Sequence, residues 1–198
     1  MLIVVRHGNT FEAGEAPRRI GARTDLPLTA SGQAQAAALG AHFAERGWRF
    51  ARVLVSPLRR TRQTAAAILA AQPAAPEPET APFLREIDHG PDENCTEDKV
   101  QARIGAAALA EWDAAATPPP GWSVDAEARI AAWADLLREL KAGQAPTLLV
   151  TSNGAARFAL LAAPELHAPT LKLPTGSFGI IQRGADGALS VPVWGQRP

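Results

Sequence analysis

An arginine and a histidine stand side by side near the N-terminus, at Arg6 and His7, and Gly8 follows them directly. A guanidinium pairs with phosphate or carboxylate through two parallel hydrogen bonds, and an imidazole titrates close to neutral pH. A glycine lets the backbone turn sharply or approach a ligand closely. The three residues are therefore candidates for a site that binds and acts on an anionic substrate.

The residues before this tripeptide indicate how it is held. Residues 2–5 are four consecutive apolar residues, three of them β-branched, which predicts a short strand buried on both faces. Ligands of open parallel sheets bind just beyond the carboxyl ends of the strands, so Arg6 and His7 are expected to project into such a crevice. Taken alone, Arg-His-Gly after a strand is as often an ordinary loop, and the rest of the chain has to decide.

The segment Arg6-His7-Gly8-Asn9-Thr10 resembles the opening motif of the histidine phosphatase superfamily, the phosphoglycerate mutase-like proteins. That motif is Arg-His-Gly followed by a polar residue and Thr. The resemblance implies that His7 is the nucleophile that takes up a phosphoryl group, with Arg6 holding the phosphate and Asn9 contacting the substrate.

A second block, at residues 56–65, resembles the family pattern Ser-x-Leu-x-Arg-x-x-Gln-Thr-Ala. Ser56 before Pro57 predicts a capped helix with the proline at its first position. The first turn of such a helix offers free N–H groups and the positive end of the helix dipole, which both favour phosphate. The resemblance makes Arg60 the phosphate-binding arginine. Arg59, about 100 degrees away around the helix, is expected in solvent.

A third block lies at residues 83–90 and resembles the family's Leu-x-Glu-x-x-x-Gly, in which the glutamate is the proton donor. The resemblance makes Glu86 the candidate general acid, which must carry a proton when the leaving oxygen needs it. Taken alone, a glutamate in a loop is more often a solvated charge. His89, in the same block, is expected to be a loop residue within reach of the substrate.

The last block, at residues 151–157, follows a predicted strand and aligns with the family pattern without a gap, but Ser152 stands where the family has its second histidine. In the family that histidine donates a hydrogen bond to the transferring phosphoryl group and adds positive charge. Ser152 brings a donor without charge, and the amide of Asn153 could supply a second donor for phosphate. Losing one such donor costs other enzymes about 100 to 1000-fold in turnover, so both a weakened active site and a site that only binds phosphate stay open.

Residues 11–30 have little periodicity and several glycines and prolines, which predicts a loop over the mouth of the crevice. Arg18 precedes Gly21 by three residues, the spacing at which family members place an arginine in the pocket. We therefore expect Arg18 to contact the substrate, with an ordinary solvated loop charge as the alternative.

Composition limits the classes of partner. The chain has 198 residues, 20 Lys and Arg against 20 Asp and Glu, and a single cysteine, Cys95. Balanced charge argues against a nucleic-acid partner, no apolar run approaches the length of a membrane span, and one cysteine excludes an internal disulfide. We expect a cytoplasmic protein that acts on a phosphorylated small molecule, with no cofactor and no metal; the sequence does not indicate an oligomeric state.

Predicted strands alternate with helices along the chain, which argues for an α/β fold. Together with the resemblance, this predicts a three-layer α/β/α sandwich around a mostly parallel sheet, of the phosphoglycerate mutase-like kind. We expect one domain over residues 1–198, with a helical, lid-like insertion at about 91–146, and a hairpin turn at Asp186-Gly187.

The leading hypothesis is a metal-independent phosphomonoester hydrolase that works through a phosphohistidine on His7, weakened to an unknown degree by Ser152. The alternative is a catalytically impaired phosphate-binding or regulatory module. Phosphoryl transfer of the phosphoglycerate mutase type ranks lower, because the chain is short for the glycolytic mutases of the family.

Overall fold

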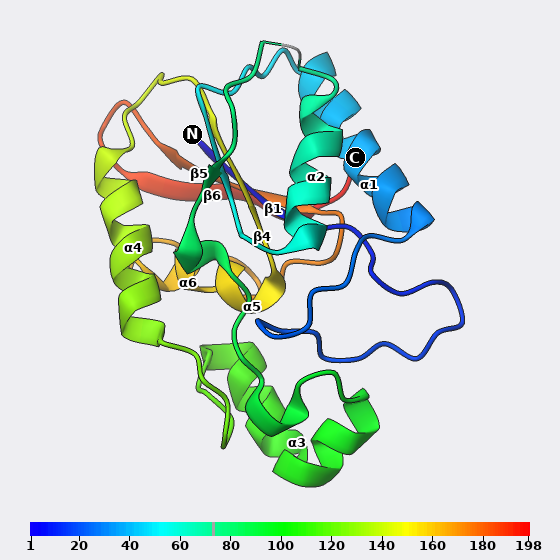
Figure 1. Cartoon of the computed structure of the whole chain (residues 1–198). Helices are drawn as coiled ribbons and strands as arrows, with labels where there is room; N and C mark the ends of the chain where they lie inside the picture. The colour runs from blue at the N-terminus through cyan, green and yellow to red at the C-terminus, as the bar shows by residue number, and fades with distance from the viewer. Residues whose placement is uncertain (73) are drawn as a thin grey trace.

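The computed structural model of the protein describes residues 1–72 and 74–198. Its strands are β1 (Leu2–Arg6), β2 (Arg52–Val55), β3 (Glu79–Thr80), β4 (Thr147–Thr151), β5 (Phe178–Arg183) and β6 (Leu189–Gln196). Its helices are α1 (Ala30–Glu45), α2 (Arg59–Leu69), α3 (Glu97–Ala115), α4 (Ala126–Glu139), α5 (Asn153–Ala156) and α6 (Phe158–Leu161), with the short 3₁₀ helices η1 (Pro82–Leu84) and η2 (Gly90–Asp92). Figure 1 shows their arrangement.

The described strands form one sheet in the order β3-β2-β4-β1-β5-β6. β3, β2, β4 and β1 run parallel, whereas β5 and β6 are antiparallel to their neighbours. The predicted α/β fold is confirmed, and the antiparallel strands make the sheet mixed. Arg6 at the end of β1 pairs with Thr151 at the end of β4. The residues that follow these two strands therefore emerge together at one edge of the sheet.

Each face of the sheet carries its own apolar core. In β1, Ile3 and Val5 belong to one core and Leu2 and Val4 to the other, because successive side chains of a strand point to opposite faces. Figure 1 shows α1 and α2 on one side of the sheet and α4 and α6 on the other. Members of the two cores from these helices are Leu39, Phe43 and Ile68 on the first side, and Trp133 and Phe158 on the second.

The stretch 91–146 contains α3 and α4. α4 packs on the second face of the sheet through Trp133, whereas α3 lies beyond the strand ends (Figure 1). α3 bends at Gly105, where φ is 81°, a conformation that glycine adopts readily. The Arg103 Nε donates to Oδ1 of Asp92 at 2.6 Å and so ties α3 to η2. That this stretch is a lid-like insertion within one domain stays a prediction.

The start of α2 differs from the prediction. The helix begins at Arg59 instead of Pro57, its N-cap residue Leu58 makes no capping bond, and Oδ1 of Asp25 accepts from the N–H of Arg59 at 2.7 Å. The hydroxyl of Thr61 donates to the carbonyl oxygen of Ser56 at 2.9 Å, so the turn before the helix is closed by a residue from within it. The helix still presents the predicted face, because Arg60 is buried and Arg59 is exposed.

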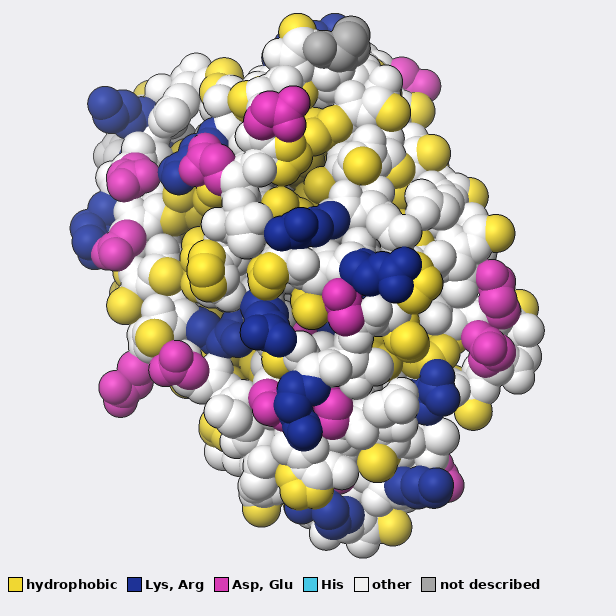
Figure 2. All heavy atoms as spheres, viewed as in Figure 1, with side chains coloured by type: hydrophobic (Ala, Val, Ile, Leu, Met, Phe, Trp, Pro, Cys, Tyr) yellow, Lys and Arg dark blue, Asp and Glu magenta, His cyan; other side chains and the backbone are white. Residues whose placement is uncertain are grey.

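No helix in the described part of the chain is long and apolar enough to cross a membrane. Figure 2 shows Lys and Arg side chains across the middle of one face, with Asp and Glu side chains beside several of them. Surface ion pairs include Arg23 Nε with Asp88 Oδ1 at 3.0 Å and Arg52 Nη2 with Glu79 Oε2 at 2.9 Å. This face therefore carries both signs of charge.

Candidate active site

His7 directly follows β1, at the edge where β4 also ends. Its backbone N–H donates to the carbonyl oxygen of Thr151 at 3.1 Å, and the residue is only 3% exposed. Nδ1 lies 2.7 Å from the carbonyl oxygen of Gly8. Because a carbonyl oxygen only accepts, this contact places the hydrogen on Nδ1 and leaves the lone pair on Nε2. The imidazole therefore offers Nε2 as its nucleophilic atom.

The surroundings of His7 favour its neutral form. Burial lowers the pKa of His7 well below its ordinary value, and the positive charges of Arg60 and Arg6 lower it further. The hydrogen bond with Gly8 acts in the opposite direction without outweighing them. A nucleophilic imidazole needs an unprotonated nitrogen, so the site holds His7 in its reactive form at neutral pH.

Arg60, in the first turn of α2, is fully buried beside His7. Its Nη1 donates to the carbonyl oxygen of Thr24 at 2.8 Å and its Nη2 to that of Gly21 at 3.2 Å. Its Nε donates to Nε2 of His7 at 3.2 Å. The guanidinium is thus anchored to the loop after β1 and covers the lone pair of the histidine. A phosphoryl group can reach His7 only by taking over this hydrogen bond.

Arg6 faces the same histidine from β1. Its Nη1 donates to the carbonyl oxygen of Leu173 at 2.9 Å, and its Nε is buried without a hydrogen-bond partner among the described residues. Burial lowers the pKa of Arg6 to about 10, against the opposing effect of the negative charge on Glu86. Arg6 therefore remains a cation at neutral pH and keeps donors available for an anion.

Glu86 follows η1 and is 7% exposed. Its Oε1 accepts from the N–H of Ile87 at 2.9 Å, and its Oε2 accepts from the N–H of Gly154 at 3.1 Å. A Cβ added at Gly154 would clash with Oε1 of Glu86. The close approach of α5 to the carboxylate therefore requires a glycine at this position, and it holds the side chain in one orientation.

Ser152 and Asn153 follow β4 and are placed differently. Ser152 is fully buried, its hydroxyl oxygen has no hydrogen-bond partner among the described residues, and the residue does not line the cavity described below. Asn153 does line it, and its Oδ1 accepts from the N–H of Leu173 at 2.8 Å. This bond leaves the Nδ2 donor of Asn153 available in the cavity, one residue after Ser152, the position at which the resemblance leads one to expect a histidine.

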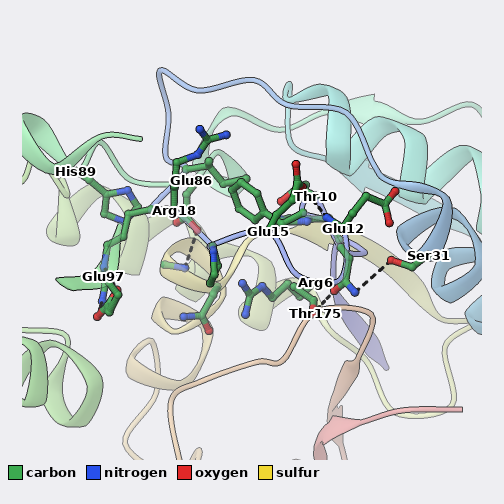
Figure 3. Close-up of a pocket in the computed structure, with 18 of the residues that line it drawn as sticks. Arg6, Thr10, Glu12, Glu15, Arg18, Ser31, Glu86, His89, Glu97 and Thr175 are labelled. Carbon is green, nitrogen blue, oxygen red and sulfur yellow. Dashed lines mark hydrogen bonds and ion pairs between the residues drawn. The ribbon is translucent and has the colours of Figure 1, made fainter. Parts of the chain in front are cut away.

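These groups open on a cavity of about 710 Å³. We call the part lined by Arg6, His7, Glu86, Asn153 and Gly154 its inner end. The remaining lining residues, which form its outer part, come mostly from the loop after β1 and include Thr10, Phe11, Glu12, Glu15, Arg18 and Arg19. Figure 3 shows Arg6 and Glu86 directed into the cavity, with Arg18 and Glu97 at its margin.

The two predicted substrate contacts both reach this cavity. Arg18 is exposed, its guanidinium carbon lies 5.3 Å from the centre of the Phe11 ring, and it forms no ion pair within the described part of the chain. The Oδ1 of Asn9 accepts from the hydroxyl of Thr175 at 2.8 Å, which fixes its amide. Their roles in binding a substrate stay predictions.

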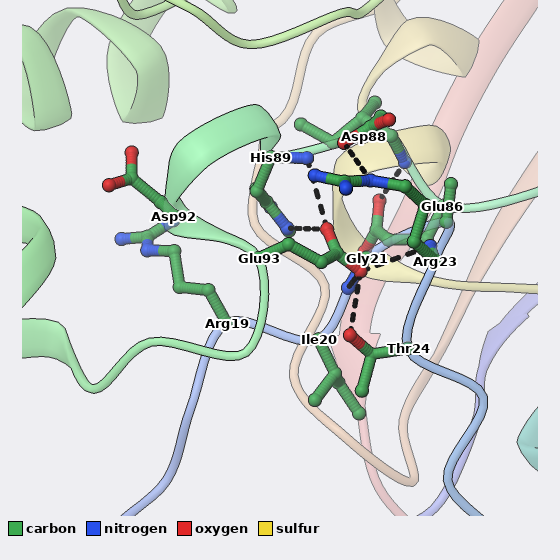
Figure 4. A network of polar contacts seen from close by, with 12 residues as sticks. Arg19, Ile20, Gly21, Arg23, Thr24, Glu86, Asp88, His89, Asp92 and Glu93 are labelled. Atoms are coloured by element: carbon green, nitrogen blue, oxygen red, sulfur yellow. Dashed lines mark hydrogen bonds and ion pairs between the residues drawn. The ribbon is translucent and has the colours of Figure 1, made fainter.

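The cavity region also has residues for which no role was predicted. Glu93 accepts from the N–H of Gly21 and the hydroxyl of Thr24, both at 2.8 Å, and its Oε2 lies 3.6 Å from Nδ1 of His89 (Figure 4). Burial acts to raise the pKa of Glu93, but the contacts with His89, Thr24 and nearby N–H groups bring it down to about 2. His89 is buried in the cavity wall. The only sequence signal for the location of His89 in the cavity wall is that it follows Glu86 by three residues.

Positive charge at the inner end comes from buried arginines. Besides Arg6 and Arg60, Arg157 is fully buried, with its guanidinium carbon 3.9 Å from the centre of the Trp112 ring. Burial lowers the pKa of Arg157 to about 10, and the negative charge of Glu86 acts to raise it, as it does for the other two arginines. Within residues 1–72 and 74–198, no group of three or more His, Cys, Asp or Glu is arranged to hold a metal ion.

Known proteins resemble this chain in sequence and in fold. The family model of the histidine phosphatase superfamily (branch 1) matches residues 2–192. No curated protein matches the chain at a significant level. The family match covers nearly the whole chain and includes every residue assigned above to the inner end of the cavity.

Solved structures share the fold. The mycobacterial glucosyl-3-phosphoglycerate phosphatase Rv2419c has 22% identity and a TM-score of 0.78, over 100% of this chain and 99% of that one. The open reading frame Rv3214 of Mycobacterium tuberculosis has 23% identity and a TM-score of 0.76, over 99% and 97%. TTHB049 of Thermus thermophilus has 32% identity and a TM-score of 0.63, over 90% and 91%.

Proposed function

Since this chain belongs to the histidine phosphatase superfamily (branch 1), we propose that it is a phosphomonoester hydrolase that works through a phosphohistidine on His7. The observation that carries the proposal is the neutral, buried imidazole whose Nδ1 is fixed by the carbonyl of Gly8. Its Nε2 is the atom left to react, and a carboxyl group, Glu86, lines the same cavity.

The first step transfers the phosphoryl group to the protein. Nε2 of His7 attacks phosphorus and forms the N–P bond, the P–O bond to the alcohol breaks, and Glu86, which takes up a proton when the substrate binds, gives that proton to the leaving oxygen. Arg60 exchanges its hydrogen bond with Nε2 for one with a phosphoryl oxygen, while Arg6 and the Nδ2 of Asn153 donate to the other oxygens. These donors are in place before the reaction, which is the condition for stabilising the charge that develops.

The second step releases phosphate. Glu86, now a carboxylate, takes a proton from a water molecule as its oxygen attacks phosphorus, and the N–P bond breaks with its electron pair returning to Nε2 of His7. Inorganic phosphate leaves, and both residues are back in their starting forms.

The proposal includes a phosphorylated small molecule as substrate and a cytoplasmic location, which rest on the balanced charge and the single cysteine of the sequence.

Hydrolysis of p-nitrophenyl phosphate tests this function. His7→Ala should abolish turnover, and Glu86→Ala should lower kcat by about 100-fold or more, the usual contribution of a general base, because the second step loses the group that takes the proton from water. His167→Ala is the matched control, because His167 is exposed and does not line the cavity. Acid-labile phosphate bound to the rapidly quenched wild-type protein should be missing from His7→Ala. Turnover that survives His7→Ala would refute the mechanism.

A phosphate-binding module without turnover is the second candidate, and one observation favours it. Ser152 stands where the family has its second histidine, and its buried hydroxyl has no partner among the described residues. On this hypothesis, phosphate or vanadate raises the unfolding temperature of a protein that hydrolyses no aryl phosphate. Asn153→His, which places an imidazole in the lining of the cavity, is then expected to gain activity. Turnover by the wild type that depends on His7 would exclude it.

A further inference from the structure

The backbone on either side of Glu86 is held by groups from distant segments. The hydroxyl of Thr151 donates to the carbonyl oxygen of Leu84 at 2.7 Å. The N–H of Ala22 donates to the carbonyl oxygen of Ile87 at 2.9 Å. These bonds come from β4 and from the loop after β1, so the sheet side of the segment is fixed by the same elements that hold His7.

The backbone just before Glu86 is also held by a side chain, that of Arg129 in α4. Its Nη1 donates to the carbonyl oxygen of Phe83 at 2.8 Å and to that of Arg85 at 2.6 Å. Its Nε donates to the carbonyl oxygen of Val124 at 2.7 Å, at the entrance to α4. Burial lowers the pKa of Arg129, and the negative charge of Glu86 acts to raise it. The guanidinium therefore joins the start of α4 to the backbone directly before Glu86.

We propose that Arg129 is a positioning residue for Glu86, and that it holds the carboxyl group at the place from which it protonates the leaving oxygen. The inference rests on the proposed function, in which Glu86 is the acid. The peptide unit between Arg85 and Glu86 is planar and rigid. A donor that fixes the carbonyl of Arg85 therefore also fixes the positions of N and Cα of Glu86, from which its side chain leaves the backbone.

The stretch 91–146 provides a second tie to this segment. Asp88 and Ser123 exchange two backbone hydrogen bonds, of 3.1 and 2.8 Å. Arg129 and Ser123 flank the start of α4. The stretch 91–146 therefore forms hydrogen bonds with the backbone both before and after Glu86. The stretch thus supports the catalytic carboxyl group in addition to walling the cavity.

The leaving group reveals whether a variant has misplaced the acid. An alkoxide needs a proton to leave, whereas p-nitrophenolate leaves without one. The measured quantity is kcat/KM, which covers the steps up to departure of the alcohol and excludes hydrolysis of the phosphohistidine. A general acid contributes about 100 to 10,000-fold, so Arg129→Met should lower kcat/KM for propyl phosphate by about 30-fold or more. The same variant should lower kcat/KM for p-nitrophenyl phosphate by less than about threefold, because this leaving group does not need the acid.

Arg183 offers a matched control at the other end of α4. Its guanidinium also binds three backbone carbonyls, those of Leu137, Leu140 and Gly187, but none of these belongs to the segment around Glu86. Arg183→Met should lower the unfolding temperature and leave the ratio of the two kcat/KM values within about twofold of the wild type. Equal losses on both esters in Arg129→Met, or no loss on propyl phosphate, would overturn the inference.

Arg129→Lys covers the case in which the methionine variant does not fold. An ammonium group keeps the charge but lacks the planar fork that holds several carbonyls in fixed directions. The same selective loss on propyl phosphate is expected, at about fivefold or more. A lysine variant with equal losses on the two esters would show that Arg129 acts on stability alone.

A double-mutant cycle separates this inference from the proposed function. With Glu86→Gln already present, Arg129→Met should change the ratio of the two kcat/KM values by less than about twofold, because residues that act through one group are not additive. A further selective loss in this background would overturn the positioning role. Failure of the proposed function has a different signature, which is wild-type turnover that does not require His7.

Discussion

The two ends of the cavity are built on different principles. At the inner end, His7 directly follows β1, Asn153 lies two residues after the end of β4, and backbone N–H groups bind both oxygens of Glu86. In the outer part, the side chains come from the loop after β1, and Arg18 is exposed and unpaired within the described part of the chain. Groups that do chemistry need fixed geometry, whereas loops tolerate change. Under the proposed function, the sheet edge therefore fixes the reacting groups and the loop is left to select the substrate.

The sharpest test of this contrast is a methyl group added at each end. Gly154→Ala should push the Glu86 carboxyl group out of place, because the new Cβ clashes with its Oε1. A displacement of about 1 Å at a reacting group can cost about 100-fold, so we expect a loss of that order in kcat/KM for propyl phosphate, with phosphate binding retained.

Gly14→Ala is the comparison in the outer loop. A Cβ there meets no atom within 4 Å, although the positive φ of 90° adds backbone strain of about 1–2 kcal/mol. Turnover should stay within about twofold of the wild type. If the two alanine variants lost activity equally, the inner end would be no more tightly built than the outer part.

The pH dependence of stability tests how deeply the inner end is buried. The pKa of His7 is lowered on folding, so the unfolded chain binds a proton below about pH 6.5 that the folded protein does not bind. The free energy of unfolding should therefore be fully retained above that pH and fall as the pH drops below it.

Urea unfolding at pH 7.5 and pH 5.5 measures this fall. Wild type should lose up to about 1.4 kcal/mol more per pH unit than His7→Gln, the value for one proton. His167→Gln should keep the wild-type slope, because His167 is exposed. A His7→Gln slope equal to that of the wild type would mean that the imidazole protonates freely in the folded state.

The smallest effect is expected at Arg18. Exposed charges contribute about 0.2–1 kcal/mol, so Arg18→Ala should leave kcat unchanged and raise KM by about twofold to fivefold, most for substrates with a second anionic group. Arg59→Ala, an exposed arginine outside the cavity lining, is the control. A tenfold loss of kcat in Arg18→Ala would place that residue with the inner end.

Much of the inner end could be predicted from the sequence because the signals are local. Four apolar residues before Arg6 indicated the strand, which is buried on both faces as predicted. The helical period predicted that Arg59 points to solvent, away from Arg60, and Arg59 is indeed exposed whereas Arg60 is buried. The turn at Asp186-Gly187 was correctly placed between β5 and β6.

The errors and omissions concern contacts that no short pattern specifies. The Ser56-Pro57 signal did not locate the start of α2, because Thr61 closes that turn from within the helix. An arginine on a helix surface is ordinarily a solvated charge. Arg129 instead binds the carbonyls of Arg85 and Phe83, which lie 44 and 46 residues before it in the chain. No local pattern encodes such a contact, so only the folded arrangement could indicate it.

The hydrogen bond from Arg60 to Nε2 of His7 has one more consequence. While no anion occupies the inner end, the reactive nitrogen is shielded, and an uncharged electrophile that diffuses into the cavity finds its lone pair already engaged. Only a molecule with enough negative charge to draw the guanidinium toward itself uncovers the nucleophile. Under the proposed function, the phosphate thus supplies the very charge that exposes the atom with which it reacts.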